Sequence, residues 1–253
     1  MGQDAWDSVC RRILMQNFYI NSVKIDWSQI SKDSYLRKIK AIKKLEKFSF
    51  EKPVTIFSGE NGSGKSTLLE AIAKNYGFNE EGGTLNMKFE TYNDTSELHN
   101  AITLAKGGMK RSGYFFRAES FFNVASEYET LRTLPGGAKT PEYHAMSHGE
   151  SFMEYISGFD SPGVFILDEP EAALSPNRQM DLLLFINKMI HKGAQFIIVT
   201  HSPILLSFPN ADILSFSEEG LKKIFYEQTD SYRIMELFIN HKESILNNLL
   251  KDS

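Results

Sequence analysis

One nine-residue segment restricts the fold of this chain more than any other. It reads Gly59-Glu60-Asn61-Gly62-Ser63-Gly64-Lys65-Ser66-Thr67 and matches the pattern G-x-x-x-x-G-K-S/T from Gly59 to Ser66. The apolar run 54–57 precedes it, and residues 66–74 follow with helix formers and helical apolar spacing. A glycine loop between a buried strand and a helix is the context in which this pattern binds phosphate. The alternative, a purely structural glycine turn, is disfavoured by that strand and that helix.

The residue types of the loop have physical reasons. Glycines let the backbone turn so that successive N–H groups point at phosphate oxygens, and the start of the helix adds a favourable dipole. Lys65 is expected to reach the β- and γ-phosphates, and the Ser66 hydroxyl is expected to bind Mg²⁺. The predicted ligand is ATP with Mg²⁺, held by Gly59, Glu60, Asn61, Gly62, Ser63, Gly64, Lys65, Ser66 and Thr67.

A second apolar run, residues 164–167, ends in two acids. In P-loop enzymes an acid at this place holds the metal, and we assign that role to Asp168. Glu169 should point elsewhere because side chains alternate along a strand, so it is the candidate general base for the attacking water. Taken alone, the motif would be a solvated strand end. Together with the loop it predicts a catalytic site.

His201 follows a third apolar run, residues 196–200, and a helix is expected between the two runs at Pro176–His191, ending at Gly193. Strand, helix and strand at this spacing form a parallel crossover unit. Ligand sites form at the carboxyl ends of such strands, so we expect His201 to contact the γ-phosphate. The alternative is a structural histidine.

The remaining segments are organised around this unit as one domain, 1–253, in which 79–113 is an expected insertion and 120–160 an expected helical region. Residues 38–50 fit either helix or strand. The other expected elements are strands at 19–27 and 114–116, a short helix around 98–105, a hairpin from 213–216 and 221–226, and a helix at 232–250 with a candidate break near His241.

Composition narrows the class of protein. With 253 residues, 42% of them hydrophobic, the chain can bury one sizeable core. Its net charge of -4 argues against a generally basic nucleic-acid binder. One cysteine forms no intrachain disulfide, and no apolar run approaches the roughly twenty residues that span a bilayer. An acidic start without an apolar segment also argues against a signal peptide, so we expect a soluble, cytoplasmic protein.

Five phrases carry a resemblance to a known family: GENGSGKSTLLEAIA, RAESFFNVA, SHGES, LDEPEAALSP and FIIVTHSPILL. Their order resembles the ABC-type ATPases, and within them the non-transporter branch that includes RecF, SMC and OLD-type proteins. More closely, they are similar to stand-alone bacterial AAA/ABC ATPases inferred from sequence. The resemblance covers residue 54 to the C-terminus. It implies an α/β P-loop NTPase fold with a mostly parallel central sheet, an N-terminal antiparallel β part and a helical signature-motif part.

The resemblance also implies roles for individual residues. Ser147 and Gly149, and Glu150 beside them, would contact ATP bound on an opposite subunit. Residues 173–175 would match the D-loop, and His201 the switch histidine. Active ABC ATPases join two heads head-to-tail around two ATP molecules, so a homodimer is implied.

The chain departs from the usual ABC pattern at several positions. His148 replaces the first glycine of the signature, Glu150 replaces its glutamine, and Ser175 stands where many transporters have aspartate. The Q-loop glutamine is not obvious. Arg117, as a phosphate contact, and Glu119, as a metal contact, are its candidate substitutes, and surface salt bridges are equally good interpretations of both. Tyr35 and Phe50 are weak candidates for stacking on adenine.

Three functions remain open at this level. The first is an ATP-hydrolysing switch that acts on a separate effector protein or on DNA, in bacterial anti-phage defence or DNA maintenance. The second is a transporter energy module, and the third a nucleotide-binding scaffold with negligible turnover. The basic run Lys38, Lys40, Lys43, Lys44 and Lys47 is the main DNA candidate, although a solvated face is the better interpretation. A second basic patch is formed by Lys106, Lys110 and Arg111.

Overall fold

A seven-stranded sheet forms the centre of the molecule. The computed structural model describes residues 18–85, 96–107, 112–118, 121 and 148–251. The strand order is β10-β9-β3-β8-β7-β6-β4, in which β9, β3, β8, β7 and β6 run parallel and the two edge strands are antiparallel to their neighbours. These strands are β3 (Val54–Gly59), β4 (Gly83–Thr84), β6 (Gly113–Arg117), β7 (Val164–Asp168), β8 (Gln195–Val199), β9 (Asp212–Ser217) and β10 (Gly220–Ile224).

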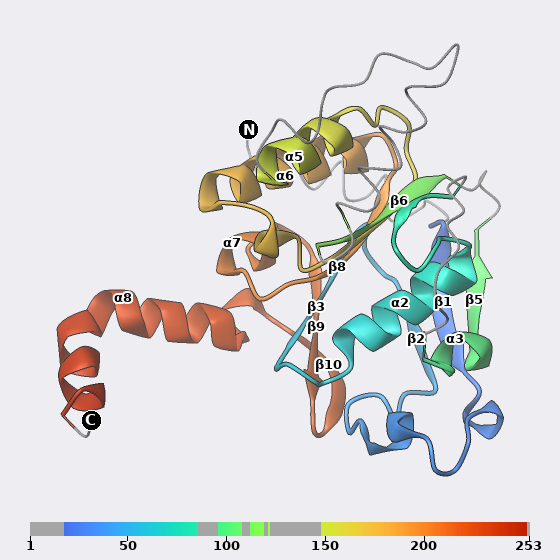
Figure 1. Cartoon of the computed structure of the whole chain (residues 1–253), viewed down its shortest axis with the longest axis horizontal. Coiled ribbons are helices and arrows are strands. Elements are labelled where there is room, and N and C mark those ends of the chain that lie inside the picture. The colour runs from blue at the N-terminus through green and yellow to red at the C-terminus, as the bar shows by residue number, and fades with distance from the viewer. Residues whose placement is uncertain (1–17, 86–95, 108–111, 119–120, 122–147, 252–253) are drawn as a thin grey trace.

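Helices cover both faces of this sheet, as Figure 1 shows. The helix α2 (Lys65–Tyr76) lies on one face, and α5 (His148–Ser157), α6 (Pro176–His191) and α7 (Pro203–Leu206) lie on the other. Side chains alternate along β7. Val164 and Ile166 therefore pack in the hydrophobic core on the face covered by α2, whereas Phe165 and Leu167 pack in the core on the opposite face, with α5, α6 and α7. A sheet buried on both faces explains why its strands read as continuous apolar runs.

A second, antiparallel sheet lies beside α2. Its strand order is β2-β1-β5, formed by β2 (Lys47–Ser49), β1 (Ile20–Ile25) and β5 (Ile102–Lys106). This confirms the expected N-terminal antiparallel part. The strands share a hydrophobic core with α2, which places them on the face of the large sheet that α2 covers.

The prediction of a helix around 98–105 is correct for the first half of the segment and wrong for the second. Only α3 (Leu98–Ala101) is helical, and residues from Ile102 onward form β5. Its pairing with β1, with Leu104 opposite Val23, buries Ile102 and Leu104 while Thr103 faces solvent. Tertiary pairing therefore overrides the local helical signal. The undecided stretch 38–50 resolves into the end of a 3₁₀ turn, η2 (Tyr35–Lys38), further turns, and β2.

The remaining elements follow the sequence expectations closely. The crossover helix α6 begins behind the Ser175 cap, and Gly193 follows its end in a left-handed conformation. The hairpin β9–β10 forms as expected. The last helix, α8 (Asp230–Leu249), has a break at His241 and projects from the body of the molecule. Short 3₁₀ turns are η1 (Trp27–Gln29), η4 (Pro170–Ala172) and η5 (Tyr226–Gln228). Within the described ranges, every helix is too short or too polar to cross a bilayer.

Candidate phosphate-binding site

The glycine loop joins β3 to α2 and encloses the lysine at the start of the helix. The Lys65 Nζ atom donates to the carbonyl oxygens of Gly59 and Glu60, both at 2.8 Å. Lys65 is only 4% exposed, and burial lowers the pKa of its ammonium, while the nearby carboxylates of Glu169, Asp168 and Glu171 act in the opposite direction. It makes no ion pair with any described residue. A cation held by neutral carbonyls is well placed to turn toward a phosphate.

Two glycines of the loop are required by close contacts. A Cβ on Gly59, which has a φ of 143°, would lie 2.5 Å from the carbonyl oxygen of Phe216 in β9. A Cβ on Gly64, with a φ of 93°, would lie 2.5 Å from the Ile42 Cδ1 atom. The loop therefore keeps its shape only with glycine at both positions.

A cavity of about 440 Å³ opens over the loop. The Ser63 Oγ atom of the loop is shielded from solvent and has no hydrogen-bond partner among the described residues. Backbone N–H groups at the start of a helix and an enclosed ammonium are the donors that a phosphate chain requires. The residues present thus fit a triphosphate. The cavity is lined by Tyr35, Ile39, Asn61, Gly62, Gly64, Lys65, Ser66, Thr67 and Glu169.

Ser66 and Asp168 form the oxygen pair expected for a metal. The Ser66 hydroxyl donates to the Asp168 Oδ1 atom at 3.0 Å. Burial raises the pKa of Asp168 to about 6, opposed by the Ser66 hydrogen bond and the positive charge of Arg117. Hydroxyl and carboxylate oxygens are ligands that Mg²⁺ accepts. Among the described residues, no group of three acidic, histidine or cysteine side chains is arranged to hold a metal ion, so phosphate oxygens and water would complete its coordination.

Glu169 and His201 meet at the carboxyl ends of β7 and β8. The Glu169 Oε1 atom lies 3.9 Å from the His201 Nε2 atom, which is shielded and lacks a hydrogen-bond partner within the described ranges. Glu169 has a left-handed backbone, with φ 47° and ψ 53°, and its N–H donates to the Val199 carbonyl oxygen at 3.0 Å. Such a conformation is uncommon for a residue other than glycine and is concentrated at functional sites. The strand pairing of β7 with β8 was predicted from the sequence and is confirmed.

The two candidates for the Q-loop position have different outcomes. Arg117 ends β6 directly opposite Asp168 in the strand register. Its guanidinium lies 2.8 Å from a carboxylate oxygen of Glu70 on α2, and it also donates weakly to the Glu80 carbonyl oxygen at 3.4 Å. Arg117 thus lies beside Asp168 and is joined to α2 by its ion pair with Glu70. Glu119 lies outside the described residues.

The structure separates the two candidates for stacking on adenine. Tyr35 lines the loop cavity and is 53% exposed, so its ring is accessible to a base. Phe50 is 5% exposed, and its ring packs at 5.1 Å from that of Phe48 in the core. Phe50 is therefore wrong as a base-stacking residue, because its faces are already used in packing.

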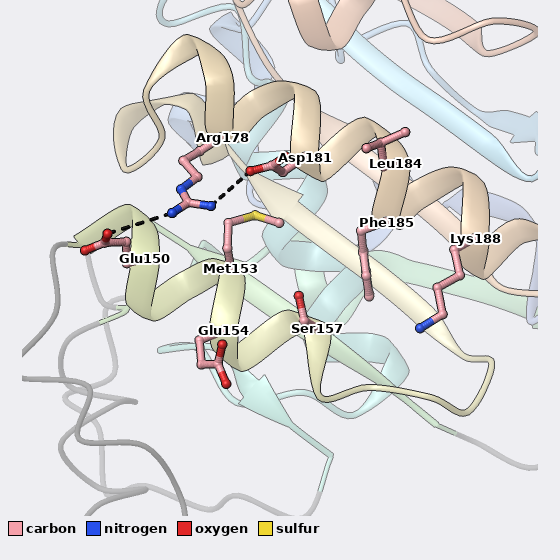
Figure 2. Close-up of a pocket in the computed structure, with 9 residues that line it drawn as sticks. All are labelled: Glu150, Met153, Glu154, Ser157, Arg178, Asp181, Leu184, Phe185 and Lys188. Atoms are coloured by element: carbon pink, nitrogen blue, oxygen red, sulfur yellow. Dashed lines mark hydrogen bonds and ion pairs between the residues drawn. The ribbon is translucent and has the colours of Figure 1, made fainter.

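Gly149 and Glu150, which the resemblance assigned to ATP, are not among the residues that line the loop cavity of their own chain. Ser147 lies outside the described residues. Gly149, in the first turn of α5, lies so close to residues 173–175 that a Cβ there would be 2.8 Å from the Ala173 carbonyl oxygen. Glu150 is exposed, 3.8 Å from Arg178, at a separate groove of about 720 Å³ between α5 and α6 (Figure 2). Ser175 caps α6 by accepting the Arg178 backbone N–H at 3.4 Å.

Two residues near the site received no role from the sequence. The Glu171 Oε1 atom accepts the His201 backbone N–H at 2.5 Å, and Gln179 is buried between the D-loop and Ser202. The only sequence signal for them was their position, in and just after the phrase LDEPEAALSP.

Comparison with protein families gives two partial matches. Residues 35–133 match the family described as "AAA domain", and residues 156–207 match the family described as "AAA domain, putative AbiEii toxin, Type IV TA system". The first range contains the glycine loop, and the second contains Asp168, Glu169 and His201.

Curated relatives point to the same class. The chain is 37% identical over 89 residues to the energy-coupling factor transporter ATP-binding protein EcfA2 of Methanospirillum hungatei, covering 34% of this chain and 22% of that protein. It is 26% identical to the glutamine transport ATP-binding protein GlnQ of Bacillus subtilis, covering 75% and 83%. A third match, ABC transporter G family member 10 of Dictyostelium discoideum, is 22% identical over 68% of this chain and 13% of that protein. The chain thus spans less than a quarter of the first and third of these proteins.

Solved structures that align with this chain include the SMC head domain from Thermotoga maritima. The TM-score is 0.44 with 13% identity, and the alignment covers 82% of this chain and 98% of that chain. Another is cbiO1 from Clostridium perfringens, part of an ABC transporter complex, with a TM-score of 0.48, 14% identity and coverage of 93% and 100%. The sequence matches relate the chain to AAA- and ABC-type P-loop ATPases.

Proposed function

We propose that this protein binds ATP with Mg²⁺ and hydrolyses it. The observation that carries the proposal is the convergence of four groups at one edge of the sheet. These are the enclosed Lys65 ammonium, the Ser66–Asp168 pair, Glu169, and His201 with its unsatisfied Nε2 atom. Each supplies one function that phosphoryl transfer to water requires.

The residues divide the work as follows. Lys65 exchanges its carbonyl partners for phosphate oxygens, aided by the N–H groups at the start of α2. Ser66 and Asp168 would hold Mg²⁺, which neutralises phosphate charge when bound. The exposed carboxylate of Glu169 accepts a proton from the attacking water, and His201 donates from its Nε2 atom to the γ-phosphate.

We further propose that the site is completed by a second copy of the chain, arranged head-to-tail. Gly149 and Glu150 lie away from the loop cavity of their own chain, yet the resemblance to ABC ATPases assigns them to a nucleotide. An opposite subunit resolves this conflict. ATP binding would then drive dimerisation, and hydrolysis would release the dimer.

The output of the cycle is proposed to be action on a separate effector protein or on DNA, in anti-phage defence or DNA maintenance. The toxin–antitoxin system named in the description of the second matching family supports this direction. A transporter energy subunit is the second candidate, because the relatives EcfA2 and GlnQ are named as transport ATP-binding proteins.

Glu169→Gln tests hydrolysis and dimerisation together. We expect the variant to bind ATP with unchanged affinity, to lose turnover, and to double its mass in light scattering when ATP is added. Lys65→Ala is the control, because it should lose binding and stay monomeric. Hydrolysis at the wild-type rate by Glu169→Gln would remove Glu169 as the base, and a monomer at all ATP concentrations would reject the head-to-tail dimer.

A further inference from the structure

Buried side chains join the His201 loop (residues 200–202) to the D-loop (residues 173–175). We infer that Gln179 and Glu171 are positioning residues that couple these two segments, so that the state of one half-site is transmitted to the other. The inference rests on the proposed function and deepens it.

Gln179 is the centre of the connection. It lies on α6 and is 7% exposed. Its Nε2 atom donates to the Leu174 carbonyl oxygen at 3.0 Å, and its Oε1 atom accepts from the Ser202 hydroxyl at 2.5 Å. One amide therefore satisfies a D-loop carbonyl and a hydroxyl adjacent to His201. Because both partners are shielded from water, neither can exchange its bond for a solvent bond without cost.

Ser202, held by Gln179, also binds the backbone at the start of α7. Its Oγ atom also accepts the N–H groups of Ile204 at 3.1 Å and Leu205 at 3.3 Å, and so caps α7. The position of the cap fixes where the chain leaves β8, and His201 is the residue immediately before it. A shift of Gln179 would therefore move the His201 backbone.

Glu171 holds the same loop from the other side. Its Oε1 atom accepts the His201 backbone N–H at 2.5 Å. Its Oε2 atom is shielded and has no hydrogen-bond partner among the described residues. Since Glu171 belongs to η4, between Glu169 and the D-loop, it ties His201 to the segment that carries the general base.

The D-loop lies against the start of α5, the helix that carries Gly149 and Glu150. Ala173 is next to Leu174, and its carbonyl oxygen is the atom that a Cβ on Gly149 would meet at 2.8 Å. The path thus runs from His201, which serves the chain's own nucleotide, through Gln179 to the D-loop and the start of α5. Under the head-to-tail arrangement, these last elements serve the nucleotide of the partner. Coupling through one buried amide would make hydrolysis at the two sites interdependent.

Gln179→Met removes both hydrogen bonds while keeping the length of the side chain. The chain offers a matched control in Gln195, which is 1% exposed and makes two 2.9 Å bonds to the N–H and carbonyl of Ile20 at the opposite edge of the sheet. Both variants lose two buried hydrogen bonds, but only Gln179→Met breaks the connection. Comparing them separates positioning from general loss of stability.

Kinetics give the first test. For Gln179→Met we expect kcat to fall roughly 10- to 100-fold, because small misplacements of reacting groups have effects of this size. The dissociation constant for ATP should change less than about twofold, and the Hill coefficient of hydrolysis should fall to one. Gln195→Met should keep the wild-type kcat and Hill coefficient. Glu171→Ala should lower kcat as Gln179→Met does, and Glu171→Gln, which keeps an acceptor for the His201 N–H, should restore it.

Hydrogen exchange gives a second test that needs no turnover. In Gln179→Met, the amides of residues 173–175 and those of Ser202, Ile204 and Leu205 should exchange faster, whereas Gln195→Met should leave both segments unchanged. Faster exchange in one segment only, or equal effects of the two variants on kcat, would overturn the coupling. A wild-type protein without ATPase activity would instead reject the proposed function, and the exchange result would still decide whether the connection exists.

Discussion

Asp168→Asn should stabilise the protein when nucleotide and metal are absent. Burial raises the pKa of Asp168 from 3.8 to about 6, so the folded chain binds this proton more tightly than the unfolded chain does. The unfolding free energy therefore falls as the pH rises through the interval from 3.8 to about 6, and it stays level above it. At pH 7.5 the folded state carries an ionised carboxylate at a cost of about 3 kcal/mol. Asparagine avoids this cost and can still accept the Ser66 hydrogen bond.

The pH dependence makes the reasoning specific. At pH 5 the wild-type carboxyl is largely protonated in the folded state, and the advantage of Asp168→Asn should shrink to roughly half of its value at pH 7.5. Urea unfolding at pH 5 and pH 7.5 in the presence of a chelator measures both values. Added Mg²⁺ and ATP should reverse the order, because a ligand at 1,000 times its dissociation constant stabilises the wild type by about 4.1 kcal/mol and Asp168→Asn would not bind it.

Asp212→Asn is the matched control. Asp212 is 4% exposed, but it pairs with the Nζ atoms of Lys52 at 3.1 Å and Lys223 at 2.6 Å. Removing its charge should destabilise the protein, because both lysines lose their ion pair with this carboxylate, although Lys223 keeps Glu51 at 3.1 Å. Two results would refute the assignment of a costly buried charge to Asp168. One is an Asp168→Asn variant that is no more stable than wild type at pH 7.5, and the other is a stability advantage that is the same at both pH values.

Three further predictions follow from contacts at the site and on the surface. Gly64→Ala should lose ATP binding and at least about 1 kcal/mol of stability, measured by calorimetry and urea unfolding, because its Cβ would meet Ile42 at 2.5 Å; binding at wild-type affinity would show that the loop adapts. Tyr35→Ala should weaken ATP binding by about 1 to 3 kcal/mol without changing the melting temperature, whereas Phe50→Ala should cost about 3 to 5 kcal/mol of stability; the reverse pattern would exchange their roles. Ile234→Ser with Leu237→Ser should leave the melting temperature unchanged, because both side chains on α8 are more than half exposed; a large drop would mean that α8 packs against the body in solution.

The parts of the fold that depend on local pattern could be predicted from the sequence. The loop, the crossover helix α6 and the strands β7 and β8 each combine an apolar run with a start or stop signal. The prediction for 98–105 was wrong in its second half because residues 102–105 form a strand only by pairing with β1, which is distant in the sequence. Phe50 failed for a related reason, since a single aromatic residue does not reveal which neighbours cover its faces. Gln179 could not be recognised as a link because a buried glutamine in a helix carries no motif.

Several polar groups at the site lack hydrogen-bond partners within the described part of the chain. At the carboxyl ends of β3, β7 and β8, the Ser63 Oγ, Glu171 Oε2 and His201 Nε2 atoms are shielded without hydrogen-bond partners among the described residues, Asp168 holds a costly charge, and Glu169 has a left-handed backbone. Shielded polar atoms without partners also occur elsewhere among the described residues, as at Thr55 and Asn187. The chemistry of the groups at the site, and not their number, is therefore what points to a ligand. A donor-rich loop, a hydroxyl–carboxylate pair and an unpaired imidazole nitrogen are matched by a phosphate chain with its cation. The chemistry of these groups is therefore an argument for the same ligand that the glycine loop predicts.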